Sequence, residues 1–192
     1  MNCPHCNMAI EPAPKRKKKC LMCGKDIYVR TDPLNKNQLL LKADDAFVLD
    51  MISYFGVSER AYSEIMSKAR GNRKLGDTIW PLLNKEKQKA AKRGAWNTVS
   101  SITYQQARYY YKTDRDYFRL LQEFMSDKLR GFKAQGITYV EISACRDERT
   151  CAKCASQNGM VLTIDDALEK MPIPVKCDNY EGWCRCVYAC KN

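Results

Sequence analysis

The chain has 192 residues, which is enough to bury a core in one or two domains. It contains eleven cysteines but a single histidine, and its formal net charge is +11. Met1-Asn2-Cys3 leads straight into the first cysteine pair, so we expect no signal peptide, and no apolar run reaches the roughly 20 residues of a membrane helix. We therefore expect no membrane partner and a reducing cytoplasm, where thiols bind metal; a disulfide framework is the alternative.

The excess of positive over negative charge is confined to the first two-thirds of the chain. Residues 137–192 carry seven basic side chains against eight acidic ones, so residues 1–136 hold a balance of +12. A phosphate backbone is the usual partner of such charge, and a solvated helix face is the alternative. The residues that we expect to bind DNA are Lys15, Arg16, Lys17, Lys18, Lys19, Arg70, Arg73, Lys74, Lys92 and Arg93.

Two cysteine pairs at the start of the chain have the spacing of a zinc ribbon. Cys3/Cys6 and Cys20/Cys23 are both C-x2-C pairs, and they enclose thirteen residues. We predict a zinc ribbon over residues 1–32, with these four cysteines as ligands and a short strand at 26–30. Thirty residues cannot fold on hydrophobic burial alone, so metal binding would supply the folding free energy. We expect His5 to be a surface residue of the first knuckle rather than a ligand.

The middle of the chain, residues 33–136, has the periodicity of helices. A turn and linker at 32–35 should lead into this region. The five expected helices run from Leu39 to Gly56, from Ser58 to about Gly71, from Leu82 to Arg93, from Trp96 to Tyr111, and from Asp114 to an end bracketed by Gly131 and Gly136. Tyrosines at helical spacing between 104 and 117 favour packing over base stacking.

The last part, residues 137–192, predicts a small α+β module stapled by a second zinc. Strands are expected at 137–143, 160–162 and 185–188, with a short helix from Thr163 or Asp165 to before Pro172. The preferred ligands are Cys151, Cys154, Cys177 and Cys184, and Cys186 is the nearest substitute. For Cys145 and Cys190 we favour plain buried thiols. The whole chain is thus expected to be α+β, with Zn²⁺ at two sites.

Two motifs in this module resemble those of a known family. Asp147-Glu148-Arg149-Thr150-Cys151-Ala152-Lys153-Cys154 is followed by Gly159 and by Cys184-Arg185-Cys186. This is similar to the D-x-R-T-C-x-x-C and H-x-x-C-R-C pattern of phage head-morphogenesis proteins, the Mu F-like minor head proteins. The resemblance covers about residues 120–190. The family histidine would fall at Glu181, and Cys177 is the obvious replacement.

The resemblance implies a non-enzymatic, portal-associated protein that helps head assembly and the passage of DNA. Its partners would be phage portal or capsid proteins, and its location the bacterial cytoplasm, the procapsid or the virion. Asp147, Arg149 and Arg185 would then be structural, with Arg185 binding carbonyls or a carboxylate and Asp147 capping a turn. The alternative function is a zinc-ribbon protein that binds nucleic acid in a regulatory or mobile-element role.

Catalysis is not expected, because the residue types that it needs are missing. A single histidine, His5, rules out a Ser-His-Asp triad, an H-N-H nuclease and an H-E-x-x-H protease. No Walker A loop and no G-x-G-x-x-G motif is present, so we expect no small-molecule substrate. A carboxylate–metal nuclease is a weak alternative, since the acidic pairs at 44–45 and 165–166 are typical of helix starts.

Overall fold

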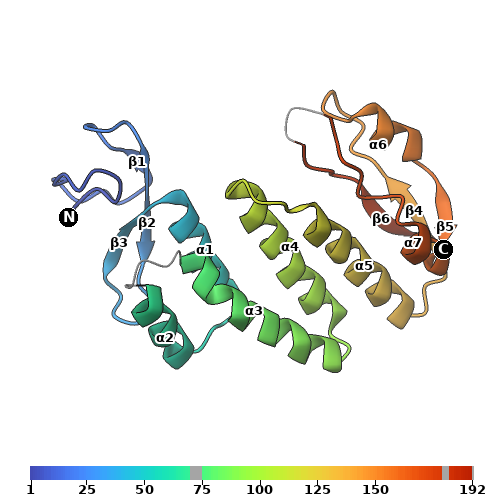
Figure 1. Ribbon diagram of the computed structural model, residues 1–192, viewed down its shortest axis with the longest axis horizontal. Helices are drawn as coiled ribbons and strands as arrows, with labels where there is room; N and C mark the ends of the chain where they lie inside the picture. Colours follow the sequence, from blue (N-terminus) through green and yellow to red (C-terminus); the bar gives the residue numbers. More distant parts are fainter. Residues whose placement is uncertain (70–74, 179–181, 192) are drawn as a thin grey trace. The chain divides into compact units, whose positions relative to one another are not determined.

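A computed structural model describes residues 1–69, 75–178 and 182–191 (Figure 1). Within these ranges it contains seven helices and two three-stranded antiparallel sheets, so the expected α+β class is confirmed. The contacts divide the chain into two compact units, Met1–Leu83 and Asn84–Asn192, and the boundary falls inside one helix. No described helix is both long and apolar enough to span a lipid bilayer. The expected division at residues 32 and 136 stays a prediction.

The sheet of the first unit has the order β1-β2-β3. Its strands are β1 (Lys18–Lys19), β2 (Asp26–Thr31) and β3 (Gln38–Leu41). Asp32 to Asn37 form the hairpin turn between β2 and β3, in which the Leu34 N–H donates to Asp32 Oδ1 at 2.9 Å. The expected linker is therefore a turn within the sheet. The prediction of helix from Leu39 was wrong, because pairing with β2 makes this leucine run a strand.

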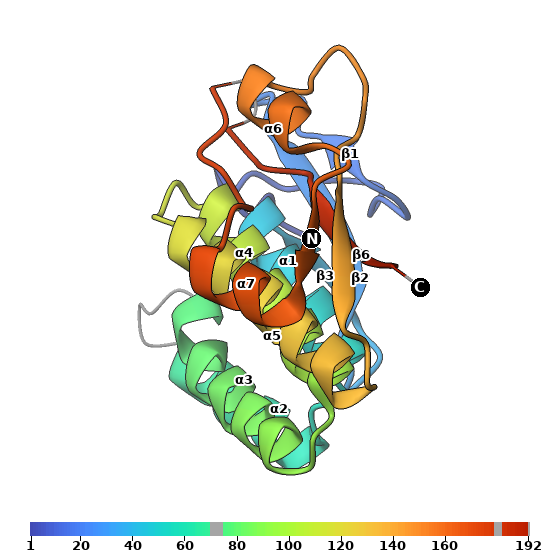
Figure 2. The same cartoon turned by 90° about the vertical axis from the view of Figure 1, so that its right-hand side faces the viewer.

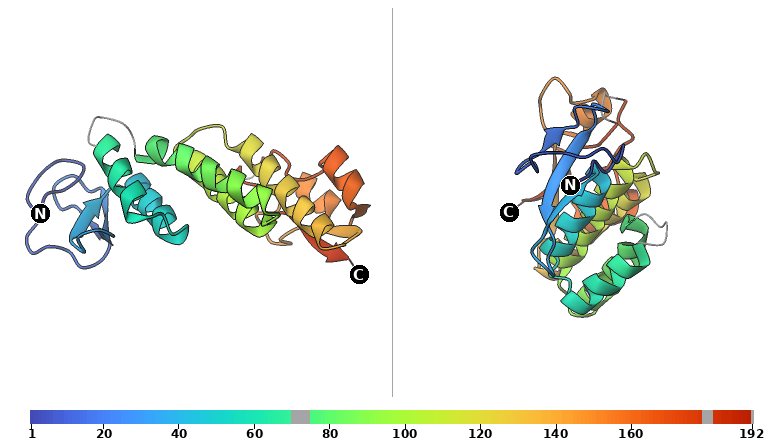
Figure 3. Two further views of the ribbon diagram at one scale, coloured as in Figure 1. Left: turned by 90° about the horizontal axis from the view of Figure 1, so that it is seen from below. Right: turned by 90° about the vertical axis from the view of Figure 1, so that its left-hand side faces the viewer.

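Helix α1 (Ala43–Tyr54) packs on β2 and β3, as the view from below shows (Figure 3). The Arg30 guanidinium joins strand to helix through a two-pronged contact with Asp50, at 2.6 and 2.8 Å. Helix α2 (Glu59–Ala69) begins as predicted after Ser58, whose Oγ accepts the Ala61 N–H. Helix α3 (Leu75–Lys92) begins well before Leu82. Pro81, a residue type that usually breaks a helix, lies inside α3, so the predicted start was wrong.

The second unit is built on the antiparallel hairpin of α4 (Trp96–Lys112) and α5 (Phe118–Ala134). Gly131 lies inside α5, and a Cβ on it would meet Trp96 Cβ at 3.1 Å, so the glycine permits close contact between the helices. The helix end predicted between Gly131 and Gly136 is confirmed, because α5 ends at Ala134. Asp116 accepts the Phe118 N–H at 3.1 Å, whereas the expected cap Asp114 has a φ of 53° and lies before the helix.

The C-terminal sheet packs against this hairpin through α5. Its order is β5-β4-β6, with β4 (Tyr139–Ser143) in the centre between β5 (Val161–Thr163) and β6 (Val187–Lys191). The fully buried Val140 and Ile142 belong to the core that β4 shares with α5 and α7 (Ile164–Lys170), which lie on the same side of the sheet (Figure 2). Thr163 Oγ1 caps α7 by accepting the Asp166 N–H at 3.0 Å. One helix was not expected: α6 (Ala152–Gln157).

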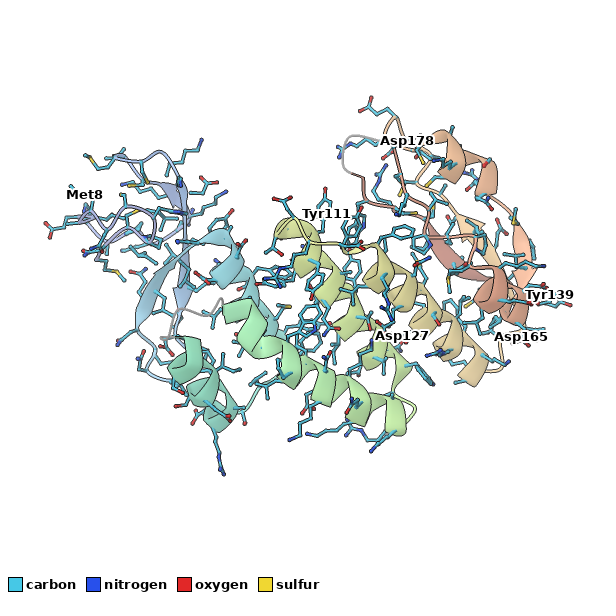
Figure 4. All side chains as sticks on the ribbon, in the orientation of Figure 1. Met8, Tyr111, Asp127, Tyr139, Asp165 and Asp178 are labelled. Carbon is cyan, nitrogen blue, oxygen red and sulfur yellow. The ribbon has the colours of Figure 1, made fainter. Side chains whose placement is uncertain are left out.

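A buried carboxylate ties the hairpin to the end of α3. Asp127 is 2% exposed, and the Thr103 hydroxyl donates to its Oδ2 at 2.7 Å (labelled in Figure 4). Lys87 Nζ lies 3.7 Å from the same oxygen and contacts Glu123 at 2.6 Å. Loss of hydration raises the pKa of Asp127 in spite of these partners. The ionised carboxylate is therefore a cost to the folded state.

We predict that Asp127→Asn stabilises the chain at neutral pH. The raised pKa means that the folded state holds the proton more tightly, so wild-type stability falls as pH rises above the ordinary carboxyl range. Asparagine still accepts the Thr103 hydroxyl but has no charge to bury. Thermal unfolding followed by circular dichroism from pH 4 to 8 should show an advantage for the variant that grows with pH. The exposed Glu123→Gln is the control; an advantage that shrinks with pH would contradict the argument.

Candidate metal centres

Four cysteines of the first unit converge on one point. Cys3 Sγ lies 3.9 Å from Cys23 Sγ, Cys6 Sγ lies 3.8 Å from Cys20 Sγ, and all four sulfurs lie within 4.8 Å of one another. With Zn–S bonds of about 2.3 Å, the edge of a tetrahedral four-thiolate site is about 3.8 Å long. The structure thus brings together the four residues that the spacing predicted, in an arrangement compatible with zinc.

The backbone of this ribbon is arranged to stabilise thiolates. The N–H groups of Cys23 and Met22 donate to Cys20 Sγ and lower the pKa of that thiol below its usual value. Cys3 and Cys20 are buried with Ile27, which is the small apolar core of the ribbon. His5 is not among the sulfurs; its Nε2 lies 3.0 Å from the Asp26 carbonyl oxygen and fixes the first knuckle to β2.

A second cluster contains five cysteines from three segments of the C-terminal module. Cys151 is the N-cap of α6, and its Sγ accepts the Cys154 N–H at 3.4 Å. Cys177 comes from the loop after α7, and Cys184 and Cys186 lie immediately before β6. Cys154 Sγ is 3.6 Å from Cys177 Sγ and 3.8 Å from Cys184 Sγ. These separations also match the edge of a four-thiolate zinc site.

The five sulfurs form two sets of three that share Cys154. One set is Cys151, Cys154 and Cys177, and the other is Cys154, Cys184 and Cys186; within each, the sulfurs lie within 4.8 Å of one another. Sequence reasoning placed Cys184 in the site with Cys186 as the substitute, and the structure brings in both. Because zinc takes four ligands, one of the five thiols exceeds the need of a single ion. Among the described residues, Cys145 and Cys190 belong to neither set; both are exposed, so the expectation that they are buried was wrong.

An ion pair joins the two sequence motifs across this cluster. Arg185 Nη1 and Nη2 donate to the two carboxylate oxygens of Asp147, at 2.7 and 2.5 Å. Asp147 Oδ1 also accepts the Arg149 N–H at 3.1 Å and the Thr150 hydroxyl at 3.0 Å, which closes the turn before Cys151. These contacts hold the pKa of Asp147 well below its usual range, with Arg185 as the main cause. Each cysteine motif is thereby positioned by a residue of the other.

Aromatic side chains that sequence reasoning did not assign to the site hold its last segment in place. The Trp183 ring, next to Cys184, stacks on Tyr117 with a centroid distance of 5.1 Å and an interplanar angle of 20°. Tyr111, at the end of α4 (Figure 4), meets Trp183 edge-on at 5.2 Å. Tyr117 Oη donates to the Gly182 carbonyl at 2.5 Å. The sequence signal for this role was a tryptophan next to a candidate ligand cysteine. The tyrosines that it contacts are set by the fold of the α4–α5 hairpin and could not be read from the sequence.

The residues expected to contact DNA fall in different parts of the structure. Lys15 to Lys19 are all exposed on the ribbon, although Lys17 Nζ contacts Asp26 at 2.8 Å and covers the Tyr28 ring. Lys92 and Arg93 are exposed at the end of α3. Arg70, Arg73 and Lys74 lie outside the described residues. Of the residues expected to contact DNA, the run from Lys15 to Lys19 is thus exposed along one described segment.

Comparison with known proteins adds no relative. No family model, no curated protein and no solved structure matches this chain.

We predict that the Asp147–Arg185 pair acts as one unit in stabilising the C-terminal module. Arg185→Lys keeps the charge but loses the two-pronged geometry, and Asp147→Asn removes the charge. Each should lower the midpoint of thermal unfolding, and the double variant should be no less stable than the worse single one. Because the pKa of Asp147 is depressed, the contribution should be present at neutral pH and disappear only in acid, as pH falls through the lowered pKa.

The matched control is Lys191→Gln, which breaks the exposed Lys191–Glu141 pair on the neighbouring strands. This variant should melt close to the wild type, because an exposed single-contact pair contributes little. Additive losses from Arg185→Lys and Asp147→Asn would show that the two residues act separately.

Proposed function

We propose that each cysteine cluster binds one structural Zn²⁺. Both clusters offer sulfur ligands only, and a closed four-thiolate site leaves no position for a substrate or an activated water. The ribbon has little apolar core beyond Ile27, so metal binding would supply much of its folding free energy. In the C-terminal module the ion would tie α6, the Cys177 loop and the start of β6 to each other.

We further propose that the chain, with these two zinc sites, is a non-enzymatic phage or prophage minor head protein. The observation that carries it is the Asp147–Arg185 contact. The resemblance rests on two short motifs that lie 30 residues or more apart, D-x-R-T-C-x-x-C and C-R-C. Their non-cysteine residues bind each other while their cysteines share one cluster, so the two motifs behave as parts of one structural device.

Cys177 supports the same proposal at the position where this chain departs from the family pattern. It stands four residues before Glu181, where the family histidine would fall, and its sulfur lies beside Cys154 at 3.6 Å. A thiolate in place of an imidazole preserves the number of ligands. Portal or capsid proteins would be the partners, in the bacterial cytoplasm, the procapsid or the virion.

Nucleic-acid binding by the ribbon is the second candidate function. The observation that favours it is the exposure of all five basic residues from Lys15 to Lys19, two of which form the edge strand β1. Such a run attracts phosphate and releases counterions on binding, so its affinity would fall steeply with salt.

Zinc analysis tests the two sites separately. The purified chain should contain about two zinc ions per molecule by mass spectrometry of the metal. Cys6→Ser should lose the ribbon ion, and Cys151→Ser with Cys154→Ser, which leaves three of the five thiols, should lose the other, so each variant should fall to about one. Cys190→Ser, at an exposed thiol outside both clusters, is the control and should keep both ions. Full zinc content in the Cys151→Ser/Cys154→Ser variant would contradict the second site.

Co-expression with the portal protein of the same genome tests the head-protein proposal. The wild-type chain should co-purify with the portal, and Cys151→Ser/Cys154→Ser should lose this association while the ribbon keeps its zinc. A zinc-loaded chain that does not co-purify with the portal would contradict the proposal. If that chain instead binds duplex DNA, and Lys15–Lys19 changed to Gln reduce both the affinity and its salt dependence, the second function would replace the first.

A further inference from the structure

The two knuckles of the ribbon carry large apolar side chains that face solvent. Leu21 is 89% exposed and Met22 is 69% exposed, both between the ligands Cys20 and Cys23. Met8, just after Cys6, is 48% exposed (Figure 4). Single exposed apolar residues are ordinary, but several gathered around one point mark an interaction surface.

The hydrogen bonds to sulfur place these residues at one end of the ribbon. The Met8 N–H donates to Cys6 Sγ, and the Met22 N–H donates to Cys20 Sγ. The two sulfurs lie 3.8 Å apart. The backbones of Met8 and Met22 therefore both contact the same sulfur cluster, while their side chains are exposed to solvent. We call Met8, Leu21 and Met22 the apolar tip.

The apolar tip is bordered by positive charge. Lys18 and Lys19 directly precede the second knuckle and are exposed, and Lys25 directly follows it and is also exposed. Residues 1–41 hold eight basic side chains against three acidic ones. A surface that fits this tip must therefore combine apolar groups at its centre with negative charge around them.

We propose that the apolar tip binds an acidic, amphipathic segment of a partner protein. Flexible leucine and methionine side chains fill apolar grooves and helix faces well. The carboxylates that flank such a face would meet Lys18, Lys19 and Lys25. This inference concerns the ribbon and stands whether or not the chain is a head protein.

The chemistry of the tip favours protein over nucleic acid. Bases are commonly held by stacking on aromatic rings. The only aromatic rings in residues 1–41, all of which the structure describes, are those of His5 and Tyr28. The His5 ring binds the Asp26 carbonyl, and Lys17 Nζ covers the Tyr28 ring at 4.8 Å from its centroid. Neither ring belongs to the tip.

Site-specific photo-crosslinking tests the proposal on the full chain. The photoreactive residue p-benzoylphenylalanine replaces Met22 in one variant and Tyr54 in the control, because Tyr54 is 70% exposed on α1 of the same unit. Cells that encode the protein are irradiated, and the attached fragment is identified by mass spectrometry after nuclease treatment. We expect the Met22 probe alone to attach to a peptide with an excess of Asp and Glu around apolar residues.

A charge reversal provides the second arm. In the Met22 probe variant, Lys18→Glu with Lys19→Glu should reduce the cross-link yield several-fold while the zinc content stays unchanged. A nuclease-sensitive product would assign the tip to nucleic acid and overturn the proposal. A peptide without excess acidic residues, an unchanged yield after charge reversal, or no product above that of the Tyr54 control would overturn it as well.

Discussion

The sulfurs of four cysteines lie within 4.8 Å of Cys154 Sγ, and this cluster of five thiols is the constraint on which the C-terminal module depends. The sulfurs come from α6, from the loop after α7 and from the segment before β6, so they connect parts of the chain that the small sheet alone does not join. Thiolates at 3.6–3.8 Å repel one another unless a cation lies between them. The spacing of the sulfurs is therefore compatible with a cation site, which is the basis for proposing zinc.

The cluster also explains why its surroundings are rich in arginine and aromatic rings. Zinc with four thiolates carries a formal charge of −2, and Arg149 and Arg185 line the pocket beside the sulfurs. Arg185 is itself held by Asp147, so its position does not depend on the metal. Trp183 and Tyr117 anchor the other side of the same segment through stacking. Charge and packing thus restrict the segment from Gly182 to Cys186 before any ion binds.

Local patterns in the sequence were enough to predict most of the helices and the two cysteine pairs of the ribbon. Capping by Ser58 and Thr163 and the C-x2-C spacings are decided within a few residues of the chain. One error came from a tertiary contact, because pairing with β2 makes Leu39–Leu41 a strand. The roles of Cys186 and Trp183 also depend on tertiary contacts. Only the folded loop brings Cys186 to Cys154 and Trp183 to Tyr117.

The two cysteine clusters differ in what they present to the outside. In the ribbon, the negative charge of the thiolates is buried with Ile27, while the lysines and the apolar tip face solvent. In the C-terminal module, the acidic and basic side chains nearly balance, and Asp147 and Arg185 neutralise each other. Part of the excess positive charge therefore lies exposed on the ribbon, where residues 1–41 hold eight basic side chains against three acidic ones, whereas the second cluster uses its charges to hold its own loops. Recognition is accordingly expected from the first unit and rigidity from the end of the second.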